Sequence, residues 1–179
     1  MRRFALPALM LATTPALADM VGQPLATDLN GDRRAEVFTL QHNGDGSADL
    51  SITDTGGRGI LAQDIAWIGG PGQEPELGLA PNGSVTLTSK NDSVGRNRWF
   101  LTLTIAWRDN AYRVAGYTYT WYDTLDLAAY GVCDINLLTG RGTARIGDAA
   151  AQPVTVPRGA PAVTDWKEAA FRLPPACQG

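Results

Sequence analysis

Residues 99–107 read WFLTLTIAW, and this stretch decides the expected fold. Large apolar side chains occupy every second position from Trp99 to Trp107, while Thr102 and Thr104 lie between them. Such alternation is typical of a strand with one buried face. Turn-forming residues follow at 108–111, and residues 112–122 return with many β-branched and aromatic side chains. The stretch therefore predicts a central β-hairpin.

Shorter strand patterns flank this hairpin on both sides. The apolar run 60–68 fits a strand or a short helix, and residues 69–75 form a Gly- and Pro-rich loop. Only residues 164–173 are expected to be helical. We expect an all-β fold, an antiparallel sandwich or a partly closed barrel built from hairpins, with one short C-terminal helix. The other expected strands are 37–40 paired with 50–53, 77–79 with 85–88, 135–138 with 143–146, and an edge strand at 154–156.

The first eighteen residues have the composition of a signal peptide. Arg2 and Arg3 form a basic start, an apolar run follows, and Ala16-Leu17-Ala18 fits a signal-peptidase site. We therefore expect cleavage after Ala18, a single β-rich domain at 19–179, and a periplasmic or secreted protein. No later run reaches eighteen apolar residues, so no membrane span is expected.

Charge argues against a nucleic-acid partner. Removing Arg2 and Arg3 leaves 13 basic residues against 18 acidic ones, a formal charge of −5. The chain also has no basic cluster, which nucleic acids and anionic membranes require.

The two cysteines, Cys133 and Cys177, both lie after the expected cleavage site. In an exported chain, two cysteines most simply form one disulfide. Such a bond would close a loop of 44 residues and tie the C-terminal segment to the rest of the domain.

Residues 28–36 place oxygen-bearing side chains at the spacing of a cation-binding loop. Asp28, Asn30, Asp32 and Glu36 occupy positions 1, 3, 5 and 9, and Arg34 offers its backbone carbonyl at position 7. Ca²⁺ binds six to eight oxygen ligands from flexible loops of this kind. The alternative is an Asx-rich turn whose side chains bond only to their own backbone. The residues predict either a structural Ca²⁺ site or such a turn.

This loop resembles the calcium loops of FG-GAP and VCBS repeats, in which the pattern D-x-[DN]-x-D-G-x-x-D precedes a strand. The resemblance implies that Asp28, Asn30, Asp32 and Glu36 hold Ca²⁺. Position 6, usually glycine, is Arg33 here, and position 9 is Glu rather than Asp. A second, looser similarity covers about 50 residues from Trp99 to the N-x-L-T-G turn at 136–140. It is to small exported bacterial proteins, and it brings no known active site.

The loop is followed by a weaker copy of itself. DLNGDRRAEVFTL from Asp28 and QHNGDGSADLSIT from Gln41 share a period of 13 residues. Gln41 replaces the first carboxylate and leaves Asn43, Asp45 and Asp49, so a plain hairpin turn at Asn-Gly-Asp-Gly, residues 43–46, is the simpler interpretation. No third copy follows, which argues against a β-propeller.

No catalytic motif stands out. The single histidine, His42, lies in an expected turn, and neither G-x-S-x-G nor H-E-x-x-H is present. Asp123, Asp126 and Asp134 are the remaining source of a carboxylate pair such as glycoside hydrolases use. We therefore assign no catalytic residue, and keep a weak polysaccharide or cell-wall hydrolase acting through these acids as an alternative.

Tyr117, Tyr119 and Trp121 alternate on one face of the returning strand. If this stripe is exposed, it suits stacking on sugar rings, as in β-sandwich carbohydrate-binding modules. If it is buried, it is core. The sequence thus indicates an exported, non-enzymatic binding or accessory protein, with an unidentified protein or glycan as its partner. A carbohydrate-binding module is the alternative.

Overall fold

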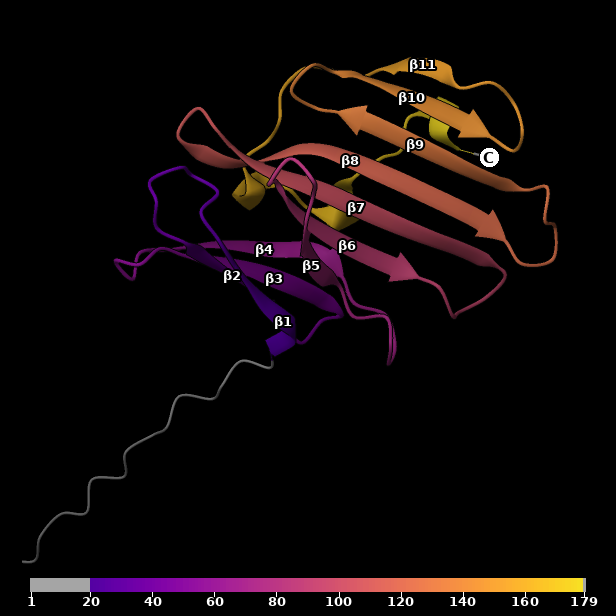
Figure 1. The fold of residues 1–179 in the computed structure, drawn as a ribbon. Coiled ribbons are helices and arrows are strands. Elements are labelled where there is room, and N and C mark those ends of the chain that lie inside the picture. Colours follow the sequence, from indigo (N-terminus) through magenta and orange to yellow (C-terminus); the bar gives the residue numbers. More distant parts are fainter. Residues whose placement is uncertain (1–19, 179) are drawn as a thin grey trace, which may run out of the picture.

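The computed structural model describes residues 20–178, and in this range the chain forms two antiparallel sheets (Figure 1). Within each sheet, every strand pairs with its neighbours in sequence. The all-β prediction is confirmed, and the sheets do not close into a barrel. The first sheet contains β1 (Met20–Thr27), β2 (Glu36–His42), β3 (Ser47–Thr53) and β4 (Gly59–Trp67). The second contains β5 (Glu76–Leu79), β6 (Val85–Asn91), β7 (Asn97–Arg108), β8 (Ala111–Asp123), β9 (Tyr130–Asn136), β10 (Arg141–Ile146) and β11 (Gln152–Thr155).

The central hairpin predicted from residues 99–122 is β7 and β8. Trp99 lies opposite Trp121, and Leu103 lies opposite Tyr117, so their side chains share one face. Ala115 is the extra residue of a bulge in β8, opposite the step from Thr104 to Ile105. The predicted hairpin of 37–40 and 50–53 is β2 and β3, and the apolar run 60–68 is a strand, β4.

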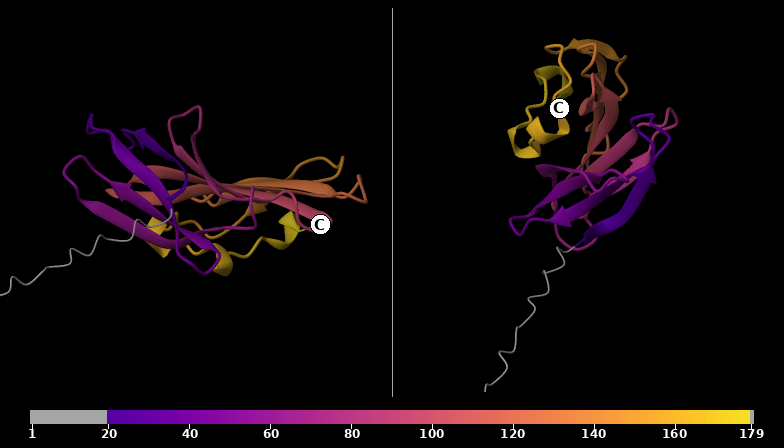
Figure 2. Two further views of the ribbon diagram at one scale, coloured as in Figure 1. Left: turned by 90° about the horizontal axis from the view of Figure 1, so that it is seen from below. Right: turned by 90° about the vertical axis from the view of Figure 1, so that its left-hand side faces the viewer.

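One buried apolar cluster contains residues of both sheets, including Phe38, Leu50 and Ile65 from the first and Leu103 and Ile135 from the second. The seven-stranded sheet is wider than the four-stranded sheet that packs on it. The C-terminal segment runs along the same side of the wider sheet, as the two views in Figure 2 show. It contacts β4, β8, β9 and β10. The core is therefore covered partly by a sheet and partly by an irregular segment.

The predicted helix at 164–173 is wrong. The segment contains two single 3-10 turns, η1 (Val163–Asp165) and η2 (Glu168–Ala170), and a third turn, η3 (Pro175–Cys177), follows. Trp166 and Phe171 pack together at 5.1 Å between ring centroids, whereas Ala169 and Ala170 are exposed. An extended path places both aromatic side chains on the sheet, and this outweighs the weak helical preference of a ten-residue segment.

A disulfide joins Cys133 in β9 to Cys177 in η3, as predicted, with 5.3 Å between the Cα atoms. It anchors the C-terminal segment to the seven-stranded sheet. The predicted signal peptide, 1–18, lies outside the described residues. Among residues 20–178, no helix has the length and apolar character needed to cross a membrane.

Candidate functional site

The loop at 28–36, here called the cation loop, connects β1 to β2 and is organised by its own side chains. Asp28 accepts hydrogen bonds from the amides of Gly31 and Arg33, each at 2.8 Å. The side chains of Asn30 and Asp32 each accept a 2.8 Å bond from the amide two residues later. These bonds curl the backbone around the carboxylates, as cation-binding loops of this spacing require.

Two residues of the cation loop adopt left-handed backbone, Gly31 with φ 81° and Arg33 with φ 69°. Glycine adopts this conformation freely, whereas an arginine pays a steric cost. The chain therefore forms the turn that the loop pattern needs at position 6 even without glycine.

Glu36 closes the cation loop from the first position of β2. Its side chain is 1% exposed, and Oε2 accepts a 2.8 Å hydrogen bond from the amide of Leu29. One carboxylate oxygen from each of Asp28, Asp32 and Glu36 lies within 4.8 Å of the other two. The structure thus brings together three of the predicted ligands. The other two predicted ligands lie in the same loop. The side chain of Asn30 accepts the amide of Asp32, and the amide of Arg34 donates to the side chain of Asp32.

Tyr112 of β8 reaches the cation loop from the seven-stranded sheet, and sequence reasoning missed it. Burial, and after it the negative charge of Glu36, raise its pKa to about 12. Its ring also packs edge-on against Phe38 and Trp107, at 6.1 and 4.7 Å. The loop therefore contacts the core that both sheets share, and not only the sheet to which it belongs.

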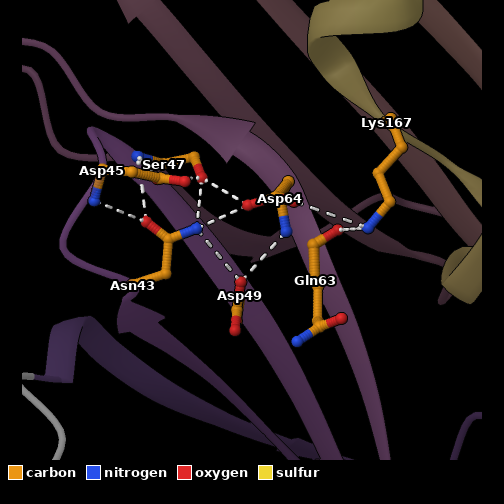
Figure 3. Close-up of polar contacts among 7 residues, drawn as sticks. All are labelled: Asn43, Asp45, Ser47, Asp49, Gln63, Asp64 and Lys167. Atoms are coloured by element: carbon orange, nitrogen blue, oxygen red, sulfur yellow. Dashed lines mark hydrogen bonds and ion pairs between the residues drawn. The ribbon is translucent and has the colours of Figure 1, made fainter.

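The weaker copy of the loop is a hydrogen-bonded turn between β2 and β3 (Figure 3). Asn43 donates from Nδ2 to Asp64 Oδ1 at 2.6 Å, and Ser47 donates from Oγ to the same atom at 2.9 Å. Asp49 accepts the amide of Asp64 at 3.0 Å. The carboxylate oxygens of Asp64 and Asp49 are thus occupied by amide and hydroxyl donors, so the arrangement supports the plain turn.

Next to this turn lies a hollow with a volume of about 780 Å³. Its lining includes Trp67 of β4, Trp99 of β7, and residues 167–170 and 172 of the C-terminal segment. Two smaller hollows continue along the same segment, past Tyr119 and Trp121 to Leu173 and Gln178. Trp99 lines all three, and we call them together the aromatic groove.

The rings of the groove form a row drawn from both sheets. The ring centroids of Trp67 and Trp99 are 5.3 Å apart, and those of Trp99 and Tyr119 are 6.4 Å apart with nearly parallel planes. All three rings are half-buried, as is that of Trp121, which lies against Gly131 of β9. Each ring is thus fixed by packing on one side while part of it reaches the groove.

Tyr117 does not belong to this row, and of the two alternatives for the stripe it is core. Its side chain is only 2% exposed, because Phe171 of the C-terminal segment packs edge-on against it at 4.5 Å. Burial raises its pKa to about 12. Tyr119 and Trp121 do line the groove, so the stripe is core at one end and partly accessible at the other.

Glu168 and Lys167 place charges in the groove. Glu168 Oε2 accepts hydrogen bonds from Ser89 Oγ at 2.6 Å and from the amide of Trp67 at 3.0 Å. Burial raises the pKa of its carboxyl above the ordinary value, although these two bonds work in the opposite direction. Lys167 lies 3.7 Å from Asp64 and donates to the backbone carbonyl of Gln63 (Figure 3). Neither residue was singled out from the sequence, since no local motif marks them.

Asp123 is the last residue of β8, whereas Asp134 lies within β9, and each is bonded to a neighbouring side chain. Asp123 forms a 2.6 Å ion pair with Arg96, which lowers the pKa of the carboxyl, and it accepts the amide of Leu125. Asp134 accepts a 2.9 Å bond from the hydroxyl of Thr118, its neighbour across β8 and β9. Since Thr118 precedes Asp123 by five residues of strand, Asp123 and Asp134 are about 17 Å apart. This exceeds the separation used by glycoside hydrolases, roughly 5 to 9.5 Å.

The chain shows no match to a protein-family model, to a curated protein or to a solved structure. Inferences about function therefore rest on the geometry of the cation loop and of the aromatic groove.

Proposed function

We propose that the protein is an exported, non-enzymatic binding or accessory protein whose N-terminal sheet is stabilised by one structural Ca²⁺ in the cation loop. The observation that carries the metal is the approach of Asp28, Asp32 and Glu36 to within 4.8 Å of one another. Within residues 20–178, no salt bridge neutralises these three carboxylates. Three like charges so close together favour a cation between them.

Calcium suits the cation loop better than magnesium or zinc. All candidate ligand atoms are oxygens, which excludes the nitrogen and sulfur preference of zinc. Mg²⁺ demands near-ideal octahedral geometry and keeps most of its water, whereas Ca²⁺ accepts irregular loops with carboxylate, amide and carbonyl oxygens. Bound Ca²⁺ would join the end of β1 to the start of β2.

Calorimetric titration with Ca²⁺ and thermal melting test the metal directly. We expect binding heat and a higher Tm with Ca²⁺, because at a free concentration 100 times Kd mass action adds about 2.7 kcal/mol. Asp32→Asn should abolish both, since it removes a charge while keeping the acceptor for the amide of Arg34. Asp45→Asn in the second turn is the matched control and should change neither. No heat and no Tm shift at millimolar Ca²⁺ would refute the site.

Export is supported by the Cys133–Cys177 disulfide, because such bonds persist in oxidising compartments. Together with the sequence of residues 1–18, this favours a periplasmic or secreted location. N-terminal sequencing of the exported protein tests the proposal, and it should start at Asp19. A protein that retains Met1 and accumulates in the cytoplasm would contradict it.

The non-enzymatic role is supported by the hydrogen bonds that Asp123, Asp134 and His42 form with neighbouring residues. His42 accepts the amide of Gly44 on Nδ1 at 2.8 Å, which is a turn contact. At the aromatic groove, Glu168 does contact a hydroxyl, that of Ser89, but Ser89 is 1% exposed and is therefore shielded from a bound ligand. Assays for release of reducing ends from polysaccharides test this role, and no release is expected.

A further inference from the structure

We infer that the aromatic groove binds a neutral, β-1,4-linked hexopyranose oligosaccharide. The inference rests on the proposed binding role and does not depend on the metal. It places the ligand across Trp67, Trp99, Tyr119 and Trp121 rather than on the stripe headed by Tyr117.

The row of rings is the first reason. Pyranose rings with equatorial substituents present apolar C–H faces, which pack against the flat faces of aromatic side chains. Trp67, Trp99 and Tyr119 follow one another at 5.3 and 6.4 Å between centroids. Tryptophan and tyrosine combine an apolar ring with a polar tip, which suits a ligand that is apolar on its faces and polar at its edges. An extended chain of sugars offers such faces in succession.

The polar groups beside the rings are the second reason. Asp45, Asp64 and Glu168 bring carboxylates to the groove, and Lys167 and Arg172 bring cations. Sugar hydroxyls both donate and accept hydrogen bonds, so they find partners on both kinds of group. The Asp64–Lys167 pair is already neutralised internally at 3.7 Å, and the remaining charges are of both signs. A strongly charged ligand would meet repulsion from one of them, which favours a neutral glycan.

The size and stiffness of the groove are the third reason. The hollow of the groove beside Trp67 and Trp99 has a volume of about 780 Å³, within the range of small-molecule sites, roughly 300 to 1,000 Å³. The wall formed by the C-terminal segment is fixed at its middle by Glu168 and at its end by the Cys133–Cys177 disulfide. Walls that are fixed before binding reduce the entropy that a ligand must overcome.

Calorimetry and tryptophan fluorescence with cellohexaose and chitohexaose test the inference. At least one hexasaccharide should bind and change the emission of Trp67 and Trp99. Trp67→Ala should weaken this binding at least tenfold, and Trp67→Phe, which keeps a flat ring, should restore part of it. Tyr130→Ala is the control, because Tyr130 is half-buried in β9 outside the groove. Its affinity should equal that of the unmodified protein.

Each titration is run in Ca²⁺ and in EDTA, after circular dichroism has shown that the variants fold. Sugar binding in EDTA without any heat from Ca²⁺ would support the groove while refuting the metal. Binding heat from Ca²⁺ without sugar binding at millimolar concentration would support the metal site and refute sugar binding in the groove. Equal affinity of the Trp67→Ala variant would also overturn the groove. Release of reducing ends from a bound hexasaccharide would support the groove and contradict the non-enzymatic role.

Discussion

The carboxylate of Glu168 accepts a 2.6 Å hydrogen bond from the hydroxyl of Ser89, which lies 79 residues earlier in the chain. The same oxygen accepts the amide of Trp67, so one side chain joins the C-terminal segment to a strand of each sheet. Ser89 is 1% exposed, and the carboxylate is therefore held in a poorly hydrated place. Burial opposes ionisation of this carboxyl, so the stability of the fold depends on pH.

Glu168→Gln should reduce the loss of stability with rising pH. Burial raises the pKa of Glu168 above 4.5 in the folded state, while the unfolded chain keeps the ordinary value. Between the two values the folded state binds more protons, so the free energy of unfolding falls as pH increases through this window. Glutamine keeps an oxygen acceptor and does not ionise. Urea unfolding at pH 4, 5.5 and 7 measures this. The free energy of unfolding of the variant should increase relative to that of the unmodified protein as pH rises, and a constant difference between the two would contradict this.

Replacing both cysteines by alanine should destabilise the protein and release the C-terminal segment. Loop-closure entropy for a separation of 44 residues gives at most about 4 kcal/mol. Urea unfolding measures this loss. Limited trypsin digestion should then cut first after Lys167 and Arg172, whereas the oxidised protein should resist at both places. Unchanged cleavage in the variant would show that the other contacts of the segment suffice.

Arg33→Gly should stabilise the cation loop. The left-handed backbone at Arg33 costs a non-glycine residue roughly 1–2 kcal/mol, and the extra freedom of glycine in the unfolded chain offsets about 0.5–1 kcal/mol. The net gain should be about 0.5–1 kcal/mol in urea unfolding, with tighter Ca²⁺ binding. Arg34→Gly is the control, because that residue is not left-handed and the change should destabilise. Equal losses in both variants would contradict the assignment.

Gly142→Ala should destabilise the pairing of β9 and β10. A Cβ atom there would lie 2.1 Å from the carbonyl oxygen of Asp134 and 2.8 Å from the Cα of Ile135, so backbone must shift. We expect a loss of about 1–3 kcal/mol, typical of overpacking. Gly70→Ala, where a Cβ meets nothing within 4 Å, should stay within about 0.5 kcal/mol of the unmodified protein. An unchanged free energy of unfolding for Gly142→Ala would show that β9 and β10 can move apart with little loss of stability.

Strands with one buried face were predictable, because period-two alternation records that burial directly. The pairing of Trp99 with Trp121 follows from such patterns and the turn between them. β1 was missed because its residues are mostly exposed, and Pro24 breaks its pattern. Pro24 is tolerated because β1 is an edge strand.

The cation loop and the groove differ in how far the sequence reveals them. Asp28, Asp32 and Glu36 lie within nine residues, so their spacing alone indicates that they converge. The groove is made from segments as distant as Trp67 and Glu168, which are 101 residues apart. No local pattern records that distance, and only the path of the C-terminal segment, mispredicted as a helix, brings these residues together.

The order of strands in the two sheets has a consequence for folding kinetics. Every strand pairs only with the strands next to it in sequence, so each sheet forms through short hairpin closures. Proteins dominated by such local contacts fold faster than sandwiches whose strands cross over between sheets. Distant closures remain where the sheets pack together and where the C-terminal segment packs against β4, β8, β9 and β10. We therefore expect the groove to form in the slowest step, after both sheets already exist.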